Sequence, residues 1–162
     1  MSNPKETTQQ RAHVVALDGS EDADKAFVWA LRNLPKNDKL VLVHGIHTQP
    51  LENPHMDWMD QATTLSREER ARLAKERHKA LFSHYEKRCK EADRVCTFET
   101  IKFRSNGELA NNICQVAEED RASTVIAGSR GLGLYDRVML GSVSTALLNR
   151  CRCSVLIARD SS

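Results

Sequence analysis

The chain has 162 residues, which fit one domain around a single hydrophobic core, and we expect a disordered tail over residues 1–11 and one domain over residues 12–160. Lysine and arginine number 24 against 22 aspartates and glutamates, and this net charge of +2 is too small to indicate a nucleic-acid or membrane surface. No apolar stretch approaches the ~18 residues of a membrane span and residues 1–10 lack the hydrophobic stretch of a secretory signal, so we expect a cytoplasmic protein without nucleic-acid or membrane partners.

The first half of the chain predicts strand, helix, strand and a long loop. Residues 13–20 form a short β-branched apolar run, which is typical of a strand buried on both faces of a parallel sheet. Ser20 is the predicted N-cap of a helix that Pro35 ends. Residues 39–47 repeat the buried-strand pattern. The loop over residues 48–65 is long for a compact domain, and we interpret it as either functional or packed on the surface.

The second half alternates helices and strands in the same way. Apolar residues recur at steps of three or four from residue 66 to residue 94, which predicts one long amphipathic helix. Its charges indicate a solvated outer face, with a basic partner-binding face as the alternative. The remaining predicted elements are an edge strand over 96–103, a helix with Leu109, Ile113, Val116 and Ala117 on one face, a strand over 123–130, a helix over 142–151 and a strand over 154–159.

The alternation of strands and helices predicts a mainly parallel sheet, because each strand must be joined to the next by a right-handed crossover. Helices then cover both faces of the sheet. In such sheets a ligand binds beyond the carboxyl ends of the strands, at the point where the strand order reverses. The loops after the first, second and fourth predicted strands are therefore the candidate sites.

The five cysteines are odd in number and contain no C-x-x-C pair. We therefore expect reduced thiols rather than a disulfide framework. The nearest pair, Cys151 and Cys153, is interpreted as packing residues, with metal binding or oxidant sensing as the alternative. The other cysteines are Cys89, Cys96 and Cys114.

The loop after the fourth predicted strand combines two glycine turns with a helix start. Glycines let a phosphate approach the backbone, and the unpaired amides of a helix start attract an anion. An arginine and three serine hydroxyls add donors, so the loop predicts a polyphosphate site; the alternative is a plain glycine-rich connection with a serine-capped helix. The residues are Gly128, Ser129, Arg130, Gly131, Gly141, Ser142, Val143 and Ser144.

Two further loop positions lie at the same end of the predicted sheet. Asp18 is interpreted as accepting a ribose hydroxyl or holding a divalent cation, with a turn before Gly19 as the alternative. The backbone near Gly45 is placed to contact an adenine edge. His44 and His47 lie at positions i and i+3 of a strand and point to opposite faces, so we expect structural roles and no shared metal.

Several catalytic motifs are absent from the sequence. It contains neither the G-x-x-x-x-G-K-[ST] of a P-loop nor a G-x-G-x-x-G after the first strand, and no G-x-S-x-G. We find no positioned base for hydrolysis. The leading hypothesis is therefore a nucleotide-binding module with at most weak ATP hydrolysis. There are two alternatives. One is a slow ATPase or nucleotide-dependent phosphotransferase that uses Asp18 and Arg130, and the other is a structural dimer without nucleotide.

Over residues 12–160 the chain resembles the ATP-binding branch of the universal stress protein family. The resemblance rests on VVALDGS in the first strand, LVLVH in the second, and the spacing Gly128-x2-Gly131-x9-Gly141-Ser142. It implies a Rossmann-like, adenine nucleotide alpha hydrolase-like fold with strand order 3-2-1-4-5. It also implies a homodimer through the fifth strand, Ser154 to Arg159, and ATP held with Mg²⁺ or Mn²⁺.

The resemblance further implies a role for each matching position. The nucleoside would lie against Ala16, Leu17 and Asp18, and the adenine beside Gly45. The function implied is an ATP-binding module of the stress response or of signalling. The ribose and phosphates would be held by Gly128, Arg130, Gly131, Gly141, Ser142, Val143 and Ser144.

Overall fold

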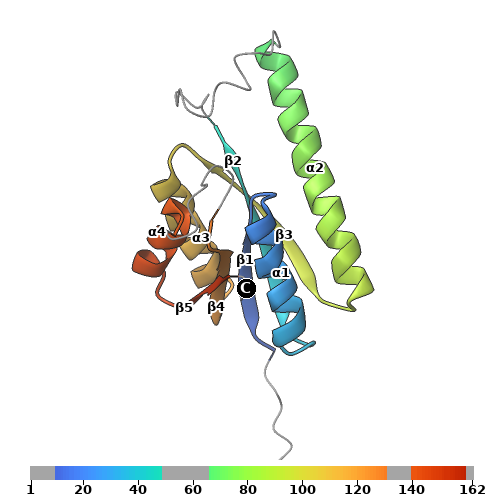
Figure 1. Cartoon of the computed structure of the whole chain (residues 1–162), viewed down its shortest axis with the longest axis vertical. Helices are drawn as coiled ribbons and strands as arrows, with labels where there is room; N and C mark the ends of the chain where they lie inside the picture. Colours follow the sequence, from blue (N-terminus) through green and yellow to red (C-terminus); the bar gives the residue numbers. More distant parts are fainter. Residues whose placement is uncertain (1–9, 49–65, 131–139, 160–162) are drawn as a thin grey trace, which may run out of the picture.

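The computed structural model describes residues 10–48, 66–130 and 140–159. They form five parallel strands and four helices (Figure 1). The strands lie in the order β3-β2-β1-β4-β5, which confirms the predicted sheet. The elements are β1 Ala12–Leu17, α1 Glu21–Asn33, β2 Lys39–His47, α2 Arg67–Glu91, β3 Cys96–Phe103, α3 Asn106–Glu119, β4 Thr124–Gly128, α4 Ser142–Arg150 and β5 Ser154–Ala158.

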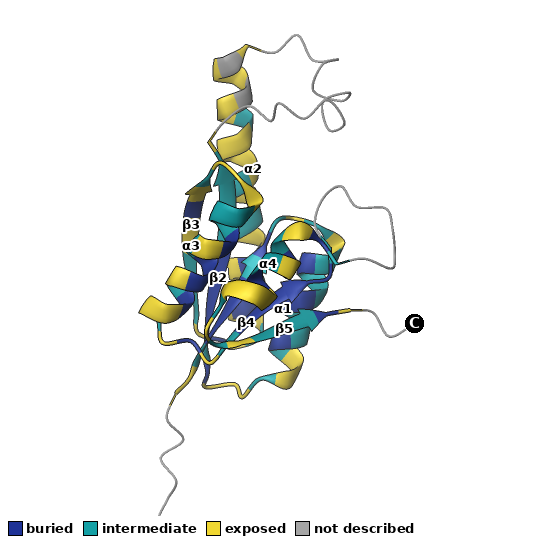
Figure 2. Cartoon of the chain, turned by 90° about the vertical axis from the view of Figure 1, so that its left-hand side faces the viewer, coloured by how far each residue is buried: buried dark blue, intermediate teal, exposed yellow. Residues whose placement is uncertain are grey.

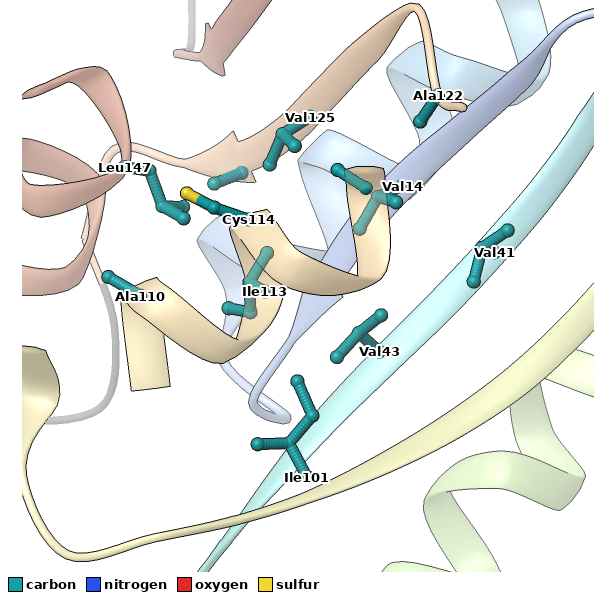
Figure 3. Close-up of a cluster of buried hydrophobic side chains, with 12 residues drawn as sticks. Val14, Val41, Val43, Ile101, Ala110, Ile113, Cys114, Ala122, Val125 and Leu147 are labelled. Atoms are coloured by element: carbon teal, nitrogen blue, oxygen red, sulfur yellow. The ribbon is translucent and has the colours of Figure 1, made fainter. Parts of the chain in front are cut away.

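The helices cover both faces of the sheet, as predicted. Successive strand residues point to opposite faces, so Val14 belongs to the core under α3 and α4, and Val15 to the core under α1 and α2. Figure 3 shows the first of these cores, in which Val14 and Val43 of the sheet lie near Ile113 of α3. Val14 and Val15 of β1 are both fully buried. This two-sided burial explains the continuous apolar runs of the strand sequences.

The strand order places a switch point between β1 and β4. From β1 the chain moves outward to β2 and β3, and then returns past β1 to β4 and β5. The loops that follow β1 and β4 therefore leave the sheet in opposite directions. A crevice at this position is where an open α/β sheet binds its ligands.

Serine caps begin three of the four described helices. Ser20, Ser66 and Ser105 accept hydrogen bonds from the backbone N–H groups of Ala23, Glu69 and Glu108, respectively. In α2 the Glu69 carboxylate also accepts a hydrogen bond from the backbone N–H of Ser66, which completes a capping box. Helix α4 begins differently, because its N-cap is Gly141 and no side chain caps it. Figure 2 shows that the N-terminal part of α2 extends past the sheet and is exposed.

The expectation that all cysteines are reduced is wrong for four of them. Cys89 at the end of α2 is bonded to Cys96 at the start of β3, and Cys114 of α3 is bonded to Cys151, the C-cap of α4. The sequence spacing shows no such pairs because the tight α2–β3 turn and the packing of α3 against α4 create them. Cys153 is a free thiol packed against the α3-side core, as the packing interpretation expects.

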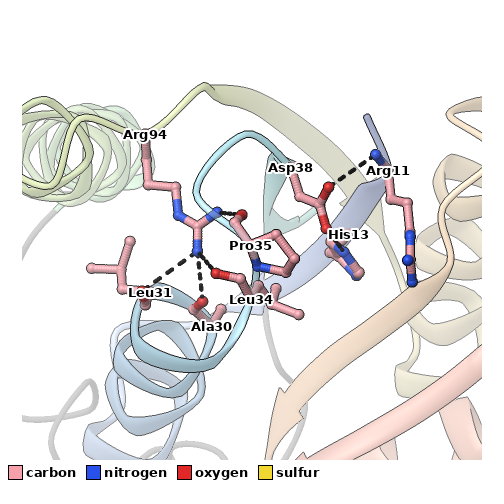
Figure 4. Close-up of polar contacts among 8 residues, drawn as sticks. All are labelled: Arg11, His13, Ala30, Leu31, Leu34, Pro35, Asp38 and Arg94. Carbon is pink, nitrogen blue, oxygen red and sulfur yellow. Dashed lines mark hydrogen bonds and ion pairs between the residues drawn. The ribbon is translucent and has the colours of Figure 1, made fainter. Parts of the chain in front are cut away.

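Arg94 joins the α2–β3 turn to the end of α1 (Figure 4). Its guanidinium donates hydrogen bonds to the backbone oxygens of Ala30, Leu31, Leu34 and Pro35. These include carbonyls that the last turn of a helix leaves without a partner. The arginine is 8% exposed, so this cap is part of the folded interior.

A second buried polar group lies at the amino end of the sheet, away from the switch point. His13 Nε2 is 3.0 Å from Asp38 Oδ2, and Asp38 Oδ1 accepts the backbone N–H of Arg11 (Figure 4). Burial raises the pKa of Asp38, but the hydrogen bonds from His13 and Arg11 outweigh it and hold the pKa below its usual value. This group joins β1 to the turn before β2.

Two predicted segments, the tail over residues 1–11 and the loop over residues 48–65, lie outside the described residues except for residues 10, 11 and 48. Within the described part of the chain, none of the helices has the length and apolar character needed to cross a membrane.

Candidate functional site

The loop after β1 is a tight turn built by Asp18. Its Oδ1 accepts the backbone N–H of Ser20 at 2.8 Å, and Gly19 between them has a φ of +82°. A positive φ of this size suits glycine. The turn interpretation of Asp18 is therefore confirmed, and its proposed contact with a ribose or a cation stays a prediction.

The end of β4 packs directly on the first turn of α1. A Cβ built on Gly128 would lie 2.5 Å from the carbonyl carbon of Asp22 and 2.6 Å from its oxygen. Only glycine allows this approach. Two further contacts join the end of β4 to the start of α4: Ser144 Oγ donates to the Gly128 oxygen at 2.8 Å, and the Gly141 N–H donates to the Ser129 oxygen at 2.9 Å.

The three serine hydroxyls expected at the phosphates all have protein partners. Ser129 Oγ donates to Asp22 Oδ2 at 2.7 Å, and buried Ser144 donates to the β4 backbone as described above. Ser142 Oγ instead accepts a hydrogen bond from Asn106 Nδ2 at 2.7 Å. A hydroxyl that accepts keeps its own proton to donate. Ser142 is thus the member of this set that is arranged to donate to a ligand.

Arg130 is held by the same carboxylate as Ser129. Its Nε lies 3.3 Å from Asp22 Oδ2, and 26% of its side chain is exposed. Burial raises the pKa of Asp22, but the hydrogen bond from Ser129 and the charges of Arg130 and Lys25 outweigh it, so the pKa lies below its ordinary value. Asp22 is therefore ionised at neutral pH. Sequence reasoning missed this role, because Asp22 occupies an ordinary acidic position in the first turn of a helix.

The start of α4 adds backbone donors beside these side chains. The first-turn amides of Ser142, Val143 and Ser144 have no side-chain cap. Such amides carry partial positive charge and attract anions. Gly131, the second glycine of the predicted motif, lies outside the described residues. The structure therefore brings together Gly128, Ser129, Arg130 and the start of α4, and leaves Gly131 unplaced.

The positions expected beside a nucleoside divide between the two faces of the sheet. Ala16 packs on the α3 side, whereas Leu17 is 3% exposed and points into the core under α1 and α2. Gly45 is crowded on its α3 side: a Cβ there would lie 2.7 Å from the Phe103 ring and 2.8 Å from Leu109. A ligand could therefore contact Leu17 through its backbone only. Phe103 and Leu109 were not expected here, since their proximity to Gly45 depends on the pairing of β2 with β3.

The two histidines of β2 contact different residues. His44 Nδ1 lies 2.7 Å from Nδ1 of His78 on α2, whose Nε2 is 3.0 Å from Thr100 Oγ1. His47 Nε2 lies 3.0 Å from the Arg104 oxygen. Burial and the neighbouring His78 lower the pKa of His44 to about 4. The described residues contain no group of three or more His, Cys, Asp or Glu that is arranged to hold a metal ion.

Solved structures of known proteins share this fold. Universal stress protein UspA from Lactobacillus plantarum superposes with a TM-score of 0.69 at 16% identity, covering 92% of this chain and 97% of that one. A family member from Arabidopsis thaliana with AMP bound has a TM-score of 0.63 at 18% identity, with 93% of each chain covered. A universal stress protein in complex with cAMP has a TM-score of 0.57 at 17% identity, covering 92% and 96%.

Sequence comparison agrees with the fold. Universal stress protein Rv2005c from Mycobacterium tuberculosis is 28% identical over 163 residues, which cover 97% of this chain and 50% of that protein. The chain thus spans about half the length of this curated relative. The model of the universal stress protein family matches residues 11–159. The chain therefore belongs to the universal stress protein family.

Proposed function

We propose that this protein binds an adenine nucleotide, with ATP as its ligand, between the loops that follow β1 and β4. The observation that carries the proposal is the uncapped start of α4, which lies beside Gly128, Ser129 and Arg130 at the switch point of the sheet. Family members of the same fold with bound AMP and bound cAMP support an adenine nucleotide.

The side chains at the switch point suit the parts of ATP. The Ser142 hydroxyl, the first amides of α4 and the Arg130 guanidinium are donors for phosphate oxygens. Asp18, the first residue after β1, would accept a ribose hydroxyl or help to hold a Mg²⁺ ion on the phosphates. Ala16 lies on the α3 side of the sheet, and the adenine would lie beside the backbone of Gly45, because Phe103 and Leu109 already fill the space on the α3 side of that residue.

The proposed role of the bound nucleotide is to set the conformation or partner preference of a cytoplasmic homodimer in the stress response or in signalling. Strand β5 supports the dimer, because it ends the sheet and pairs only with β4 among the described strands. Its central residues Val155, Leu156 and Ile157 are half-buried, which leaves apolar surface for a second copy.

Thermal unfolding with a panel of nucleotides tests the choice of ligand. Ligands that bind only the folded state raise Tm. We expect a rise with ATP and Mg²⁺, a smaller rise with AMP and cAMP, and none with GTP. An equal shift with GTP, or no shift with any adenine nucleotide, would contradict the proposal.

A further inference from the structure

We propose that Asp22 is a positioning residue that joins the two sides of the nucleotide site and orients Arg130 toward the phosphates of a nucleoside polyphosphate. The inference rests on the proposed function and assigns a role to a residue outside the family spacing of glycines and serines. Asp22 lies in the first turn of α1, on the β1 side of the switch point. Ser129 and Arg130 lie on the β4 side.

One carboxylate oxygen holds both residues that follow β4. Oδ2 of Asp22 accepts the Ser129 hydroxyl at 2.7 Å and lies 3.3 Å from Arg130 Nε. The other oxygen, Oδ1, lies 3.4 Å from Lys25 Nζ. The Asp22 side chain is 14% exposed, so these contacts form in a shielded environment in which charged hydrogen bonds are strong.

The backbone beneath Asp22 is fixed as well. Gly128 packs so closely on the Asp22 peptide that a Cβ would overlap its carbonyl carbon. The last residue of β4 and the first turn of α1 are therefore held together by both backbone and side chain. This double contact ties the position of Asp22 to that of the loop that carries Arg130.

The contact through Nε determines how Arg130 is presented. A guanidinium has five N–H donors in a planar fork; the Nε of Arg130 lies 3.3 Å from Asp22 Oδ2, and no described residue accepts a hydrogen bond from its terminal nitrogens, which are donors suited to phosphate oxygens. Holding the side chain in advance removes part of the rotamer entropy that phosphate binding would otherwise cost. The charge of Asp22 is compensated by Arg130 and Lys25, which limits its repulsion of a phosphate.

Paired substitutions test whether Asp22 acts on the phosphates. Asp22→Asn keeps the size of the side chain and an acceptor for Ser129 but removes the charge that holds Arg130. We expect it to weaken binding of ATP with Mg²⁺ about tenfold and to leave the affinity for adenosine within about twofold. Asp24→Asn, two residues along α1, is the matched control, because Asp24 pairs with Arg88 of α2 and leaves the β4 loop untouched.

A double-mutant cycle shows whether the effect passes through Arg130. In an Arg130→Ala background we expect Asp22→Asn to change ATP affinity by less than about twofold. Asp22→Glu keeps the charge, and we expect it to retain an ATP-to-adenosine affinity ratio within about threefold of wild type. It also keeps the test open if Asp22→Asn lowers Tm enough to prevent titration.

The outcomes separate this inference from the proposed function. Three results would each overturn the role of Asp22. The first is that Asp22→Asn binds ATP as tightly as wild type or more tightly, and the second is that it loses equal affinity for ATP and adenosine. The third is that Asp22→Asn weakens ATP binding just as much in the Arg130→Ala background. If the wild-type protein binds none of these ligands, the proposed function itself fails.

Discussion

Gly128 and Asp22 are in backbone contact, with 2.5 Å between the position of a Gly128 Cβ and the Asp22 carbonyl carbon. We expect Gly128→Ala to lower the free energy of unfolding by about 2 kcal/mol, because a methyl group there must push β4 away from α1. Chemical denaturation measures the change. The matched control is Gly107→Ala, where the nearest atoms belong to the flexible end of Arg150 at 3.1 Å. Equal effects of the two substitutions would contradict this account.

Arg94 provides a prediction about stability far from the site. Arg94→Ala removes the donor to the oxygens of Leu31 and Leu34 and one of the two donors to the Ala30 oxygen, and we expect a loss of about 3 kcal/mol in the free energy of unfolding. The control is Arg152→Ala, because the Arg152 side chain is 86% exposed and its ion pair with Glu118 contributes little. A loss below about 0.5 kcal/mol for Arg94→Ala would show that this cap is not structural.

The pair of His44 and His78 predicts a pH dependence of stability. The folded protein keeps His44 neutral to about pH 4, whereas the unfolded chain protonates it near the ordinary pKa of 6.5. Between these values the unfolded state binds more protons, so the free energy of unfolding falls as pH decreases from 6.5 toward 4. We expect His44→Gln to show a smaller fall between pH 7 and pH 5 in denaturant titrations. Identical pH profiles would refute the assignment to His44.

The two disulfides are expected to differ in their contribution to stability. Cys114 and Cys151 are 37 residues apart and Cys89 and Cys96 are 7 apart. In the chain-entropy model the longer loop contributes about 4 kcal/mol and the shorter about 2.5 kcal/mol. We therefore expect replacement of Cys114 and Cys151 by alanine to lower Tm more than replacement of Cys89 and Cys96. Cys153→Ala is the control. The reverse order would contradict the entropic explanation.

The strands were predicted well because their signal is local. Residues 39–47 and 96–103 were expected as strands, and β2 and β3 have those bounds. The apolar run of β2 and the partial alternation of β3 are both patterns of neighbouring residues, so no distant contact was needed to predict either strand. The strand order depends on which distant strands pair, and it was expected only through the resemblance to a family.

The side-chain contacts of the site could not be predicted in the same way. Asp22 and Ser129 are separated by 107 positions, and His44 and His78 by 34. The helical periodicity over residues 66–94 predicted the helix but carried no information on the partner of His78. Likewise, the glycine spacing indicated Gly128 correctly as a position of close approach, yet the group that approaches it is the backbone of α1.

Calorimetric titration of nucleotide-free protein with ATP and Mg²⁺ tests the central claim most directly. The comparison is with Gly141→Val, which places a branched side chain at the start of α4, where the φ of −63° and ψ of 156° are open to any residue. Asn149→Ala, at the exposed far end of α4, is the control. The account predicts one ATP per chain for wild type and the control, and a loss of binding in Gly141→Val with Tm retained. No binding to the wild type, or equal binding by Gly141→Val, would contradict it.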